Sequence, residues 1–252
     1  MNSPPLKDPY YTDGKQTIYL GDCLEVMRGF EDKSFDMILA DLPYGTTACE
    51  WDTIIPFEPL WEQYKRIIKD NGAIVLTASQ PFTSALVMSN IKMFKYEWIW
   101  EKSRPNGFLD ANRKPMKKHE NVLVFYDKLP IYNPQGIILK DKPNKNTGVE
   151  NVYGKVKQGY VAKVTYTNYP NTILKFASNT NQFHPTQKPV ALFEYLIKTY
   201  TNEGDLVLDN VMGSGTTLLA ARILGRRATG IEISEKYCQI AVDRLKQDVL
   251  PL

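Results

Sequence analysis

Hydrophobic and polar positions alternate along the chain in a way that predicts strands and helices in turn. Short apolar runs bounded by glycine, proline or polar residues predict buried strands. Between some of these runs, apolar residues recur at helical spacing, as they do from Leu60 to Ile68. Strands that alternate with helices indicate an α/β fold, with a mostly parallel sheet and helices on both faces. The expected strands cover residues 17–20, 35–40, 73–77, 96–100, 122–126, 206–209 and 228–232.

Glycine and proline mark where the expected helices end and begin. The pair Asn71-Gly72 follows the helical pattern that starts near Leu60 and predicts its end. Pro189 suits the first turn of a later helix, whose buried face includes Leu192 and Tyr200. Both helices therefore lie between expected strands, as an α/β fold requires.

The regular alternation stops between about residues 103 and 170, a stretch rich in Lys, Asn, Gly and Tyr. A structureless loop of this length is unusual in a compact domain, so we interpret it as a functional insertion. We expect the strand at 121–126 to return from the insertion to the sheet. The chain then divides into an N-terminal arm without a core role (1–16), one half of the main domain (17–102), the insertion (103–170) and the other half (171–252).

Charge is distributed unevenly along the chain. The formal net charge is +3, but residues 102–163 contain 13 Lys and Arg against 5 Asp and Glu, an excess of +8. The remaining residues therefore carry +3 − 8 = −5. A basic segment in an acidic body is typical of proteins that bind a polyanion such as nucleic acid. The alternative is a solvated lysine-rich loop.

Several classes of protein are disfavoured by the composition. No apolar run reaches the length of about 18 residues that a membrane span needs, and the polar N-terminus lacks the apolar core of a signal peptide. Three scattered cysteines (Cys23, Cys49, Cys238) and two histidines (His119, His184) have no metal-ligand spacing. We therefore expect a cytoplasmic protein with reduced thiols and no metal site.

A candidate catalytic loop, Asp41-Leu42-Pro43-Tyr44, follows the expected strand at 35–40. In open α/β sheets, active sites gather at the carboxyl ends of such strands. The loop offers a carboxylate, a carbonyl before a proline and an aromatic ring. This set suits a flat ring with an amino group, because two acceptors can hold the amine while the aromatic side chain stacks on the flat ring. The alternative is an ordinary turn, since all these residue types are common in turns.

A second candidate loop begins at Asp209, where another expected strand ends. Gly213 and Gly215 lie at the turn from this strand into a helix, where glycine lets the backbone approach a ligand closely. Glu232 ends the next strand, in the place where an acid typically binds ribose hydroxyls. A glycine pair alone is a weak signal. Together with Glu232 it favours an adenosine-bearing cofactor; the alternative for Glu232 is an acid at the start of a helix.

These motifs resemble those of amino-methylating DNA methyltransferases. Asp209 to Thr217 looks like their S-adenosylmethionine loop, and Asp41 to Tyr44 looks like their catalytic tetrapeptide. The stretch His184 to Pro189 resembles the segment before the cofactor loop, and Gly21-Asp22-Cys23 resembles the piece that contacts the cofactor adenine. The catalytic motif comes first, the basic region next and the cofactor loop last, which is the circularly permuted order of the β group. The resemblance covers about residues 17–247, except the variable middle.

The resemblance implies an enzyme that uses S-adenosylmethionine to methylate the N6 amine of adenine in duplex DNA, after flipping the base. An acid at position 41 favours adenine, whereas serine is commoner there in cytosine-N4 enzymes, so cytosine-N4 methylation is one alternative. Methylation of RNA or of a protein amide is another, although the motif order argues against it. The third is a DNA-binding relative without turnover. A dimer is common in this group, which raises a homodimer as one state of the chain.

The resemblance also implies roles for single residues. The Asp41 carboxylate and the Leu42 carbonyl would accept the two N–H groups of the amine, and Tyr44 would stack on the base. Family members usually have proline in place of Leu42, and more often Asp-Pro-Phe in place of Asp209-Asn210-Val211. The predicted catalytic residues are Asp41, Leu42, Pro43 and Tyr44. The predicted cofactor-binding residues are Asp22, Cys23, Asp41, Thr186, Lys188, Asp209, Val211, Gly213, Ser214, Gly215, Thr216 and Glu232. The predicted DNA-binding residues are Arg104, Arg113, Lys114, Lys117 and Lys118.

Overall fold

The structure, a computed structural model, describes residue 6 and residues 8–45, 52–147, 161–177 and 187–247. The chain forms two compact units: one contains the residues up to 133 and from 172 onward, and the other contains residues 134–171. His184, Pro185 and Thr186, which belong to the predicted segment before the cofactor loop, lie outside the described residues.

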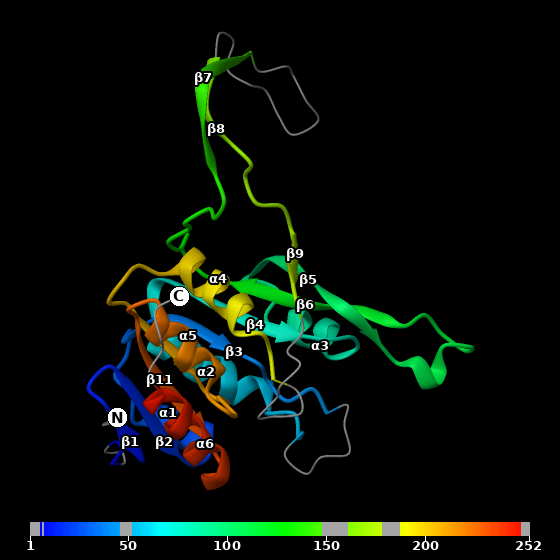
Figure 1. The fold of residues 1–252 in the computed structure, drawn as a ribbon. Coiled ribbons are helices and arrows are strands. Elements are labelled where there is room, and N and C mark those ends of the chain that lie inside the picture. The colour runs from blue at the N-terminus through cyan, green and yellow to red at the C-terminus, as the bar shows by residue number, and fades with distance from the viewer. Residues whose placement is uncertain (1–5, 7, 46–51, 148–160, 178–186, 248–252) are drawn as a thin grey trace. The chain divides into compact units, whose positions relative to one another are not determined.

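The larger unit is organised around a nine-stranded sheet with the order β1-β2-β11-β10-β3-β4-β6-β5-β9 (Figure 1). Neighbouring strands run parallel except in the pairs β1–β2, β4–β6 and β5–β6. The predicted mostly parallel α/β sheet is therefore confirmed. Its strands are β1 (Tyr11–Thr12), β2 (Gln16–Leu20), β3 (Phe35–Ala40), β4 (Ile68–Ala78), β5 (Phe94–Asn106), β6 (Lys117–Phe125), β9 (Ile173–Phe176), β10 (Leu206–Asp209) and β11 (Arg227–Glu232).

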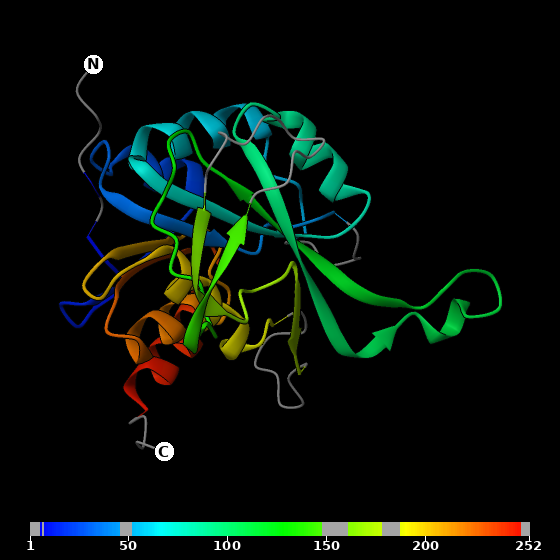
Figure 2. The ribbon, with the colours of Figure 1, turned by 90° about the horizontal axis from the view of Figure 1, so that it is seen from above.

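Helices cover both faces of this sheet because strands such as β3 are apolar on both sides. Met37 and Leu39 face one hydrophobic core, which includes residues of α4, α5 and α6, whereas Ile38 and Ala40 face a second core with α1, α2 and α3. Figure 2 shows the blue-to-cyan helices on one side of the sheet and the yellow-to-red helices on the other. The helices are α1 (Cys23–Arg28), α2 (Phe57–Ile67), α3 (Phe82–Ser89), α4 (Val190–Tyr200), α5 (Thr216–Ile223) and α6 (Glu235–Lys246).

The predicted end of the first long helix at Asn71-Gly72 is wrong. Helix α2 ends at Ile67, β4 begins at Ile68, and the Asn-Gly pair lies inside that strand. A Cβ atom on Gly72 would lie 2.7 Å from the Ile68 side chain and 2.9 Å from the carbonyl oxygen of Asp36. Glycine is therefore needed for the close approach of neighbouring backbone, and the residue does not stop a helix.

The predicted arm at 1–16 is wrong in its second part, because this part joins the sheet. Strand β1 pairs with β2, Tyr10 and Tyr11 pack against the core, and Gln16 is fully buried as the first residue of β2. The expected boundary at residue 102 also differs from the structure, since β5 continues to Asn106.

Strands β5 and β6 form a long hairpin in which Asn106 pairs with Lys117, and a short 3-10 helix, η1 (Phe108–Asp110), lies at its end. Figures 1 and 2 both show this hairpin extending well beyond the rest of the sheet. Strand β6 itself lies between β4 and β5, inside the sheet. The β5–β6 hairpin thus connects the basic segment to the main domain.

The smaller unit consists of an antiparallel pair, β7 (Ile138–Thr147) and β8 (Val161–Thr167). Next to the pair, the Asn168 side-chain amide donates to the carbonyl oxygen of Gly136 at 2.7 Å.

In the part of the chain that the structure describes, no helix has the length and apolar character of a membrane span. Within the same residues, no group of three or more His, Cys, Asp or Glu side chains could hold a metal ion.

Candidate active site

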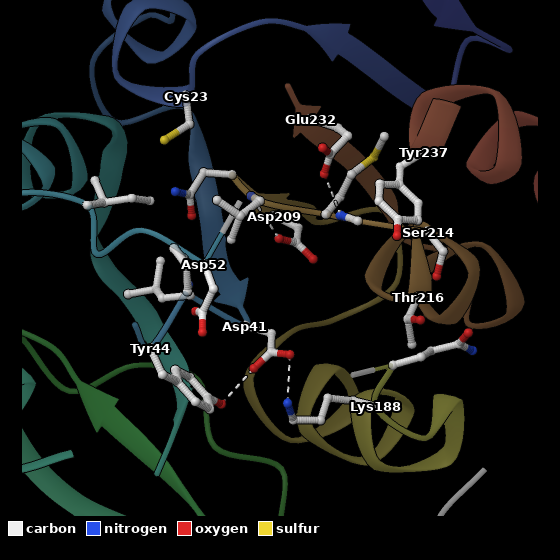
Figure 3. Close-up of a pocket in the computed structure, with 18 of the residues that line it drawn as sticks. Cys23, Asp41, Tyr44, Asp52, Lys188, Asp209, Ser214, Thr216, Glu232 and Tyr237 are labelled. Atoms are coloured by element: carbon white, nitrogen blue, oxygen red, sulfur yellow. Dashed lines mark hydrogen bonds and ion pairs between the residues drawn. The ribbon is translucent and has the colours of Figure 1, made fainter. Parts of the chain in front are cut away.

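A cavity of about 980 Å³ lies at the carboxyl ends of β3, β10 and β11. Asp41 follows β3, while Asp209 and Glu232 are the last residues of β10 and β11, and all three line the cavity. Figure 3 shows the labelled side chains around a common space, with Asp41 and Lys188 on one side of it and Glu232 on another. The parallel sheet thus brings together acids that are far apart in the sequence.

Both carboxylate oxygens of Asp41 accept hydrogen bonds. Oδ1 accepts from the Tyr44 hydroxyl at 2.7 Å and from the Thr77 hydroxyl, and Oδ2 accepts from Lys188 Nζ at 2.6 Å. Thr77 belongs to β4, which pairs with β3 in parallel register, so the sheet itself fixes this contact. The carboxylate of Asp41 is therefore held in one orientation by three donors, toward the cavity.

Lys188 belongs to a buried chain of alternating charges. Its Nζ lies 2.6 Å from Asp41 Oδ2 and 3.3 Å from Glu120 Oε2, and the other oxygen of Glu120 pairs with Lys102. The exposed fractions of the Lys188, Lys102 and Glu120 side chains are only 6%, 9% and 12%. Burial opposes the charge of Lys188, but the carboxylates of Asp41 and Glu120 outweigh this effect and raise its pKa. Lys188 is therefore a cation at neutral pH.

Tyr44 is held between the catalytic loop and the core. Its ring stacks on Phe82 with the centroids 5.2 Å apart, and Lys188 Nζ lies over the ring at 5.5 Å from its centroid. Burial, with the negative charges of Asp41 and Glu120, raises the pKa of Tyr44 well above its usual value, so its hydroxyl remains a hydrogen-bond donor. Leu42, in contrast, points its side chain into the core and is 3% exposed.

The loop after β10 is held by the Asp209 side chain. This carboxylate accepts hydrogen bonds from the Val211 N–H and the Thr217 hydroxyl, and it is 3% exposed. Burial raises its pKa to about 7 despite these hydrogen bonds. In the same loop Gly213 and Gly215 have φ angles of +52° and +78°, which glycine adopts without strain. Gly215 also packs tightly, because a Cβ there would lie 2.8 Å from that of Ala241.

Glu232 is oriented by backbone groups on both sides of it. Its Oε2 accepts from the Gly213 N–H at 2.9 Å, and its Oε1 accepts from the Ser234 N–H at 2.8 Å. Burial raises the pKa of this carboxyl, and the backbone hydrogen bonds partly offset the effect. The Ile233 backbone also hydrogen-bonds to this carboxyl. An ionised carboxylate has about four acceptor positions, so acceptor capacity remains for a ligand.

The first turn after β2 contributes the opposite wall. Asp22 caps α1, because its Oδ1 accepts from the N–H groups of Leu24 and Glu25 at 2.8 and 3.1 Å. Burial raises the pKa of the neighbouring Cys23 thiol to about 11, so this thiol is protonated at neutral pH and is no nucleophile. Both residues line the cavity.

Comparison with known proteins identifies the family. Residues 35–243 match a family model described as DNA methylase. The chain belongs to the DNA methylase family. The predicted resemblance to the β group of DNA amino-methyltransferases is thereby confirmed.

Three similar proteins illustrate this family membership. The type II methyltransferase M.HpaI of Haemophilus parainfluenzae is 27% identical over 248 residues, which are 92% of this chain and 75% of the relative. The DNA adenine methyltransferase YhdJ of Escherichia coli (strain K12) is 28% identical, covering 91% of this chain and 82% of the relative. The protein in the crystal structure of the M1.HpyAVI-SAM complex is 26% identical to this chain, with a TM-score of 0.64. The match covers 91% of this chain and 99% of that chain.

The structure of this methylase brings most of the predicted site residues to one cavity. Gly215 does not line it and instead starts α5. The predicted DNA-binding residues separate into groups: Arg104 and Lys117 line the cavity, Arg113 and Lys114 lie at the end of the β5–β6 hairpin, and Lys118 pairs with Glu101 at 2.8 Å. The predicted residues that line the cavity are Asp22, Cys23, Asp41, Leu42, Pro43, Tyr44, Arg104, Lys117, Lys188, Asp209, Val211, Gly213, Ser214, Thr216 and Glu232.

Sequence reasoning missed three members of the methylase site, namely Thr77, Lys102 and Glu120. In the sequence, Thr77 looks like one more residue of a buried strand, and Glu120 looks like a polar residue just before one. One signal was present for Glu120, since an isolated acid precedes an apolar strand inside a strongly basic segment. Only the pairing of β6 with β4 and β5 brings it to Lys188.

Proposed function

We propose that this methylase transfers a methyl group from S-adenosylmethionine to the exocyclic N6 of adenine in duplex DNA. The observation that carries the proposal is the environment of Asp41. Its carboxylate is fixed by Tyr44, Thr77 and Lys188 at the wall of the cavity that Glu232 also lines. The names of two relatives, a type II methyltransferase and a DNA adenine methyltransferase, support the same activity.

The residues around the cavity fit S-adenosylmethionine. A volume of about 980 Å³ accommodates a cofactor of this size together with a base. The Glu232 carboxylate has free acceptor positions for ribose hydroxyls. The glycine turn at Gly213 would let backbone approach the cofactor, and Lys188 would supply a cation for its carboxylate. When bound, S-adenosylmethionine supplies an electrophilic methyl group.

Asp41 and Leu42 prepare the amine for reaction. The lone pair of the adenine amine is delocalised into the ring, so the nitrogen is a poor nucleophile. The Asp41 carboxylate and the Leu42 carbonyl would accept hydrogen bonds from its two N–H groups and favour a pyramidal nitrogen whose lone pair is available to attack the methyl group. Orientation and the negative charge beside the developing ammonium lower the barrier. Bound S-adenosylmethionine would supply the methyl group and would leave as a neutral thioether, and the proton lost from the amine would pass to the Asp41 carboxylate that accepts its hydrogen bond.

Lys188 has to share Asp41 with the incoming amine. Because Oδ1 already accepts from Tyr44 and Thr77, the amine takes the remaining acceptor position at Oδ2, beside Lys188. Glu120 Oε2 lies 3.3 Å from the same ammonium and offers it a second partner. A short movement of Lys188 toward Glu120 therefore gives the amine more room at Oδ2 without leaving a buried cation unpaired.

The target amine lies inside the base stack of a duplex, so the base must be flipped into the cavity. Tyr44 provides an aromatic face there, and Arg104 and Lys117 on the cavity wall provide cations for the adjoining phosphates. The remaining predicted DNA-binding residues, Arg113, Lys114 and Lys118, extend the positive surface along the hairpin.

The test is transfer of labelled methyl from S-adenosylmethionine to mixed-sequence duplex DNA, followed by nucleoside analysis of the product. We expect N6-methyladenine, and a rate at least about 10²-fold lower for Asp41→Asn, because the amide cannot match the charge of the carboxylate. The control is Asp243→Asn, on an exposed acid of α6. Label in N4-methylcytosine would overturn the target base.

Further outcomes separate the remaining alternatives. Label in RNA or in a protein amide, with none in DNA, would overturn the substrate class. Binding of S-adenosylmethionine and DNA without any transfer would favour a DNA-binding relative without turnover. Methylation at a repeated short sequence would support a methylase of the restriction-modification type, and sequencing of the labelled positions would define the site.

A further inference from the structure

The end of the β5–β6 hairpin presents two apolar side chains almost completely to solvent. Phe108 is 80% exposed and Leu109 is 98% exposed. Among the residues that the structure describes, no other large hydrophobic side chain is as exposed as these two. Burying such side chains is favourable by roughly 1.5–3 kcal/mol each, so their adjacent exposure marks a contact surface.

The hairpin end has a defined backbone conformation. Gly107 has a φ of +93° and starts η1, and its carbonyl oxygen accepts from the Asp110 N–H at 3.1 Å. The N–H groups of Arg113 and Lys114 then donate to the carbonyl oxygen of Asp110 at 2.8 and 3.0 Å. These bonds close two successive turns. Phe108 and Leu109 therefore lie in a hydrogen-bonded turn at the end of two paired strands.

The same hairpin forms a wall of the catalytic cavity. Arg104, Asn106 and Lys117 line the cavity, and Asn106 pairs with Lys117 at the last rung of the ladder. Phe108 follows Asn106 by two residues, a span of at most about 7 Å of extended chain. This span matches about two base steps of 3.4 Å along a DNA strand. The apolar end thus begins next to the place where a flipped base enters.

Charge around the two apolar residues selects the partner. Residues 103–119 contain five Lys and Arg against one acid, Asp110. Apolar side chains flanked by cations fit the stacked bases and phosphates of DNA, where apolar wedges enter between base steps and cations bind the backbone. The exposed pair lies on the hairpin that also carries the cavity wall, which favours DNA over a partner bound elsewhere on the surface.

We propose that Phe108 and Leu109 form a wedge that enters the DNA stack beside the target and fills the gap left by the flipped base. The proposal rests on the proposed function. Flipping removes a base from the stack at a cost of a few kcal/mol. A phenyl ring and an isobutyl group in the gap restore part of the lost stacking and prevent the base from returning.

The test compares two duplexes that contain the mapped target adenine, opposite thymine in one and opposite an abasic position in the other. The double variant Phe108→Ala/Leu109→Ala is measured under single-turnover conditions against the wild type. We expect methylation of the paired target to fall about tenfold or more, the size of a lost stacking contact. Methylation opposite the abasic position should stay close to the wild-type rate, because that base is already unpaired and leaves the stack easily.

Three further measurements make the result specific. Met88→Ala/Ile91→Ala removes two apolar side chains that are 71% and 56% exposed outside the hairpin, and it should leave both rates unchanged. Lys114→Ala should slow both duplexes equally at low enzyme concentration, as loss of a phosphate contact does. With 2-aminopurine at the target, the fluorescence increase on binding should be lost in the double variant and kept in Lys114→Ala at saturating enzyme.

Several outcomes would overturn the wedge. Equal loss on both duplexes would assign Phe108 and Leu109 to affinity alone, and unchanged rates on both would remove them from DNA recognition. Binding of anionic lipid vesicles by the wild type but not by the double variant, with unchanged methylation, would assign the surface to a membrane. If the wild type methylates neither duplex, the proposed function fails and the wedge fails with it.

Discussion

Replacing Glu120 by glutamine tests the buried chain of charges beside Asp41. The change removes one negative charge from between Lys102 and Lys188, whose side chains are 9% and 6% exposed. Two buried ammonium groups then lose the carboxylate that lies between them. Removal of one partner from a buried ion pair costs about 3–5 kcal/mol, and we expect the lower value because the amide oxygen still accepts a hydrogen bond.

This loss is large enough to measure by thermal unfolding. A change of 1 kcal/mol shifts the midpoint of a domain of this size by about 2–4 °C, so Glu120→Gln should unfold about 6–12 °C below the wild type. The matched control is Glu101→Gln on the neighbouring strand. Glu101 also faces two lysines, Lys118 at 2.8 Å and Lys175 at 3.7 Å, but these are 53% and 78% exposed. Its removal should leave the midpoint unchanged, because solvent screens such pairs.

A second substitution checks the cause of the loss. Lys102→Met in the Glu120→Gln background removes the cation that lost its partner, so most of the lost stability should return. Glu120→Gln should also reduce kcat without weakening cofactor binding, because Lys188 has no second carboxylate to move to. A midpoint for Glu120→Gln that equals that of Glu101→Gln would refute the buried ionic chain.

Three more predictions concern the last residues of β10 and β11. Burial raises the pKa of Asp209 from 3.8 to about 7, so the folded state binds its proton more tightly than the unfolded state does. The free energy of unfolding of the wild type, relative to that of Asp209→Asn, should therefore fall by at most about 4 kcal/mol as pH rises from 4 to 7. Urea unfolding across this range would show a constant difference if the reasoning is wrong. Gly230→Ala places a Cβ 2.3 Å from the Met212 sulfur and should cost about 1–3 kcal/mol, which an unchanged melting temperature would contradict. Glu232→Gln should weaken S-adenosylmethionine binding about tenfold by calorimetry, through lost charged hydrogen bonds to ribose, and an equal affinity would exclude that role.

Local sequence was sufficient to predict the parts of the site that lie where a strand ends. Asp41, Asp209 and Glu232 each follow or end an apolar run, and the rule that parallel strands share a carboxyl edge brings them together. The α/β fold was predictable for the same reason, because buried strands and amphipathic helices have different periods.

The parts that depend on strand register were not predictable in this way. Glu120 reaches the cavity through the pairing of β6 with β4 and β5, and Thr77 reaches Asp41 through the pairing of β4 with β3. No local pattern records which residues of these strands lie opposite each other. Gly72 shows the same limit. A glycine is needed there because the Asp36 backbone of another strand lies close to it, but in the sequence the Asn-Gly pair looks like the end of a helix. The β5–β6 hairpin was hidden because its strands carry polar residues on both sides where they leave the core.

Strand β6 runs against both of its neighbours, so its first residues meet the edge where the parallel strands finish. In a purely parallel sheet, only the carboxyl ends of strands lie at the edge that binds the ligand. Here the first residues of β6 lie at that edge as well. The turn that joins β5 to β6 is thereby attached to the catalytic edge by two strands whose inner halves are locked in the core. Given the contact with DNA that we propose for this hairpin, insertions, deletions or exchanges between residues 107 and 116 should alter DNA recognition while Glu120 and Lys102 keep their register. Because the turn can change while the inner halves of the two strands stay fixed, the hairpin is a suitable place for engineering a new target preference without altering the residues around Asp41.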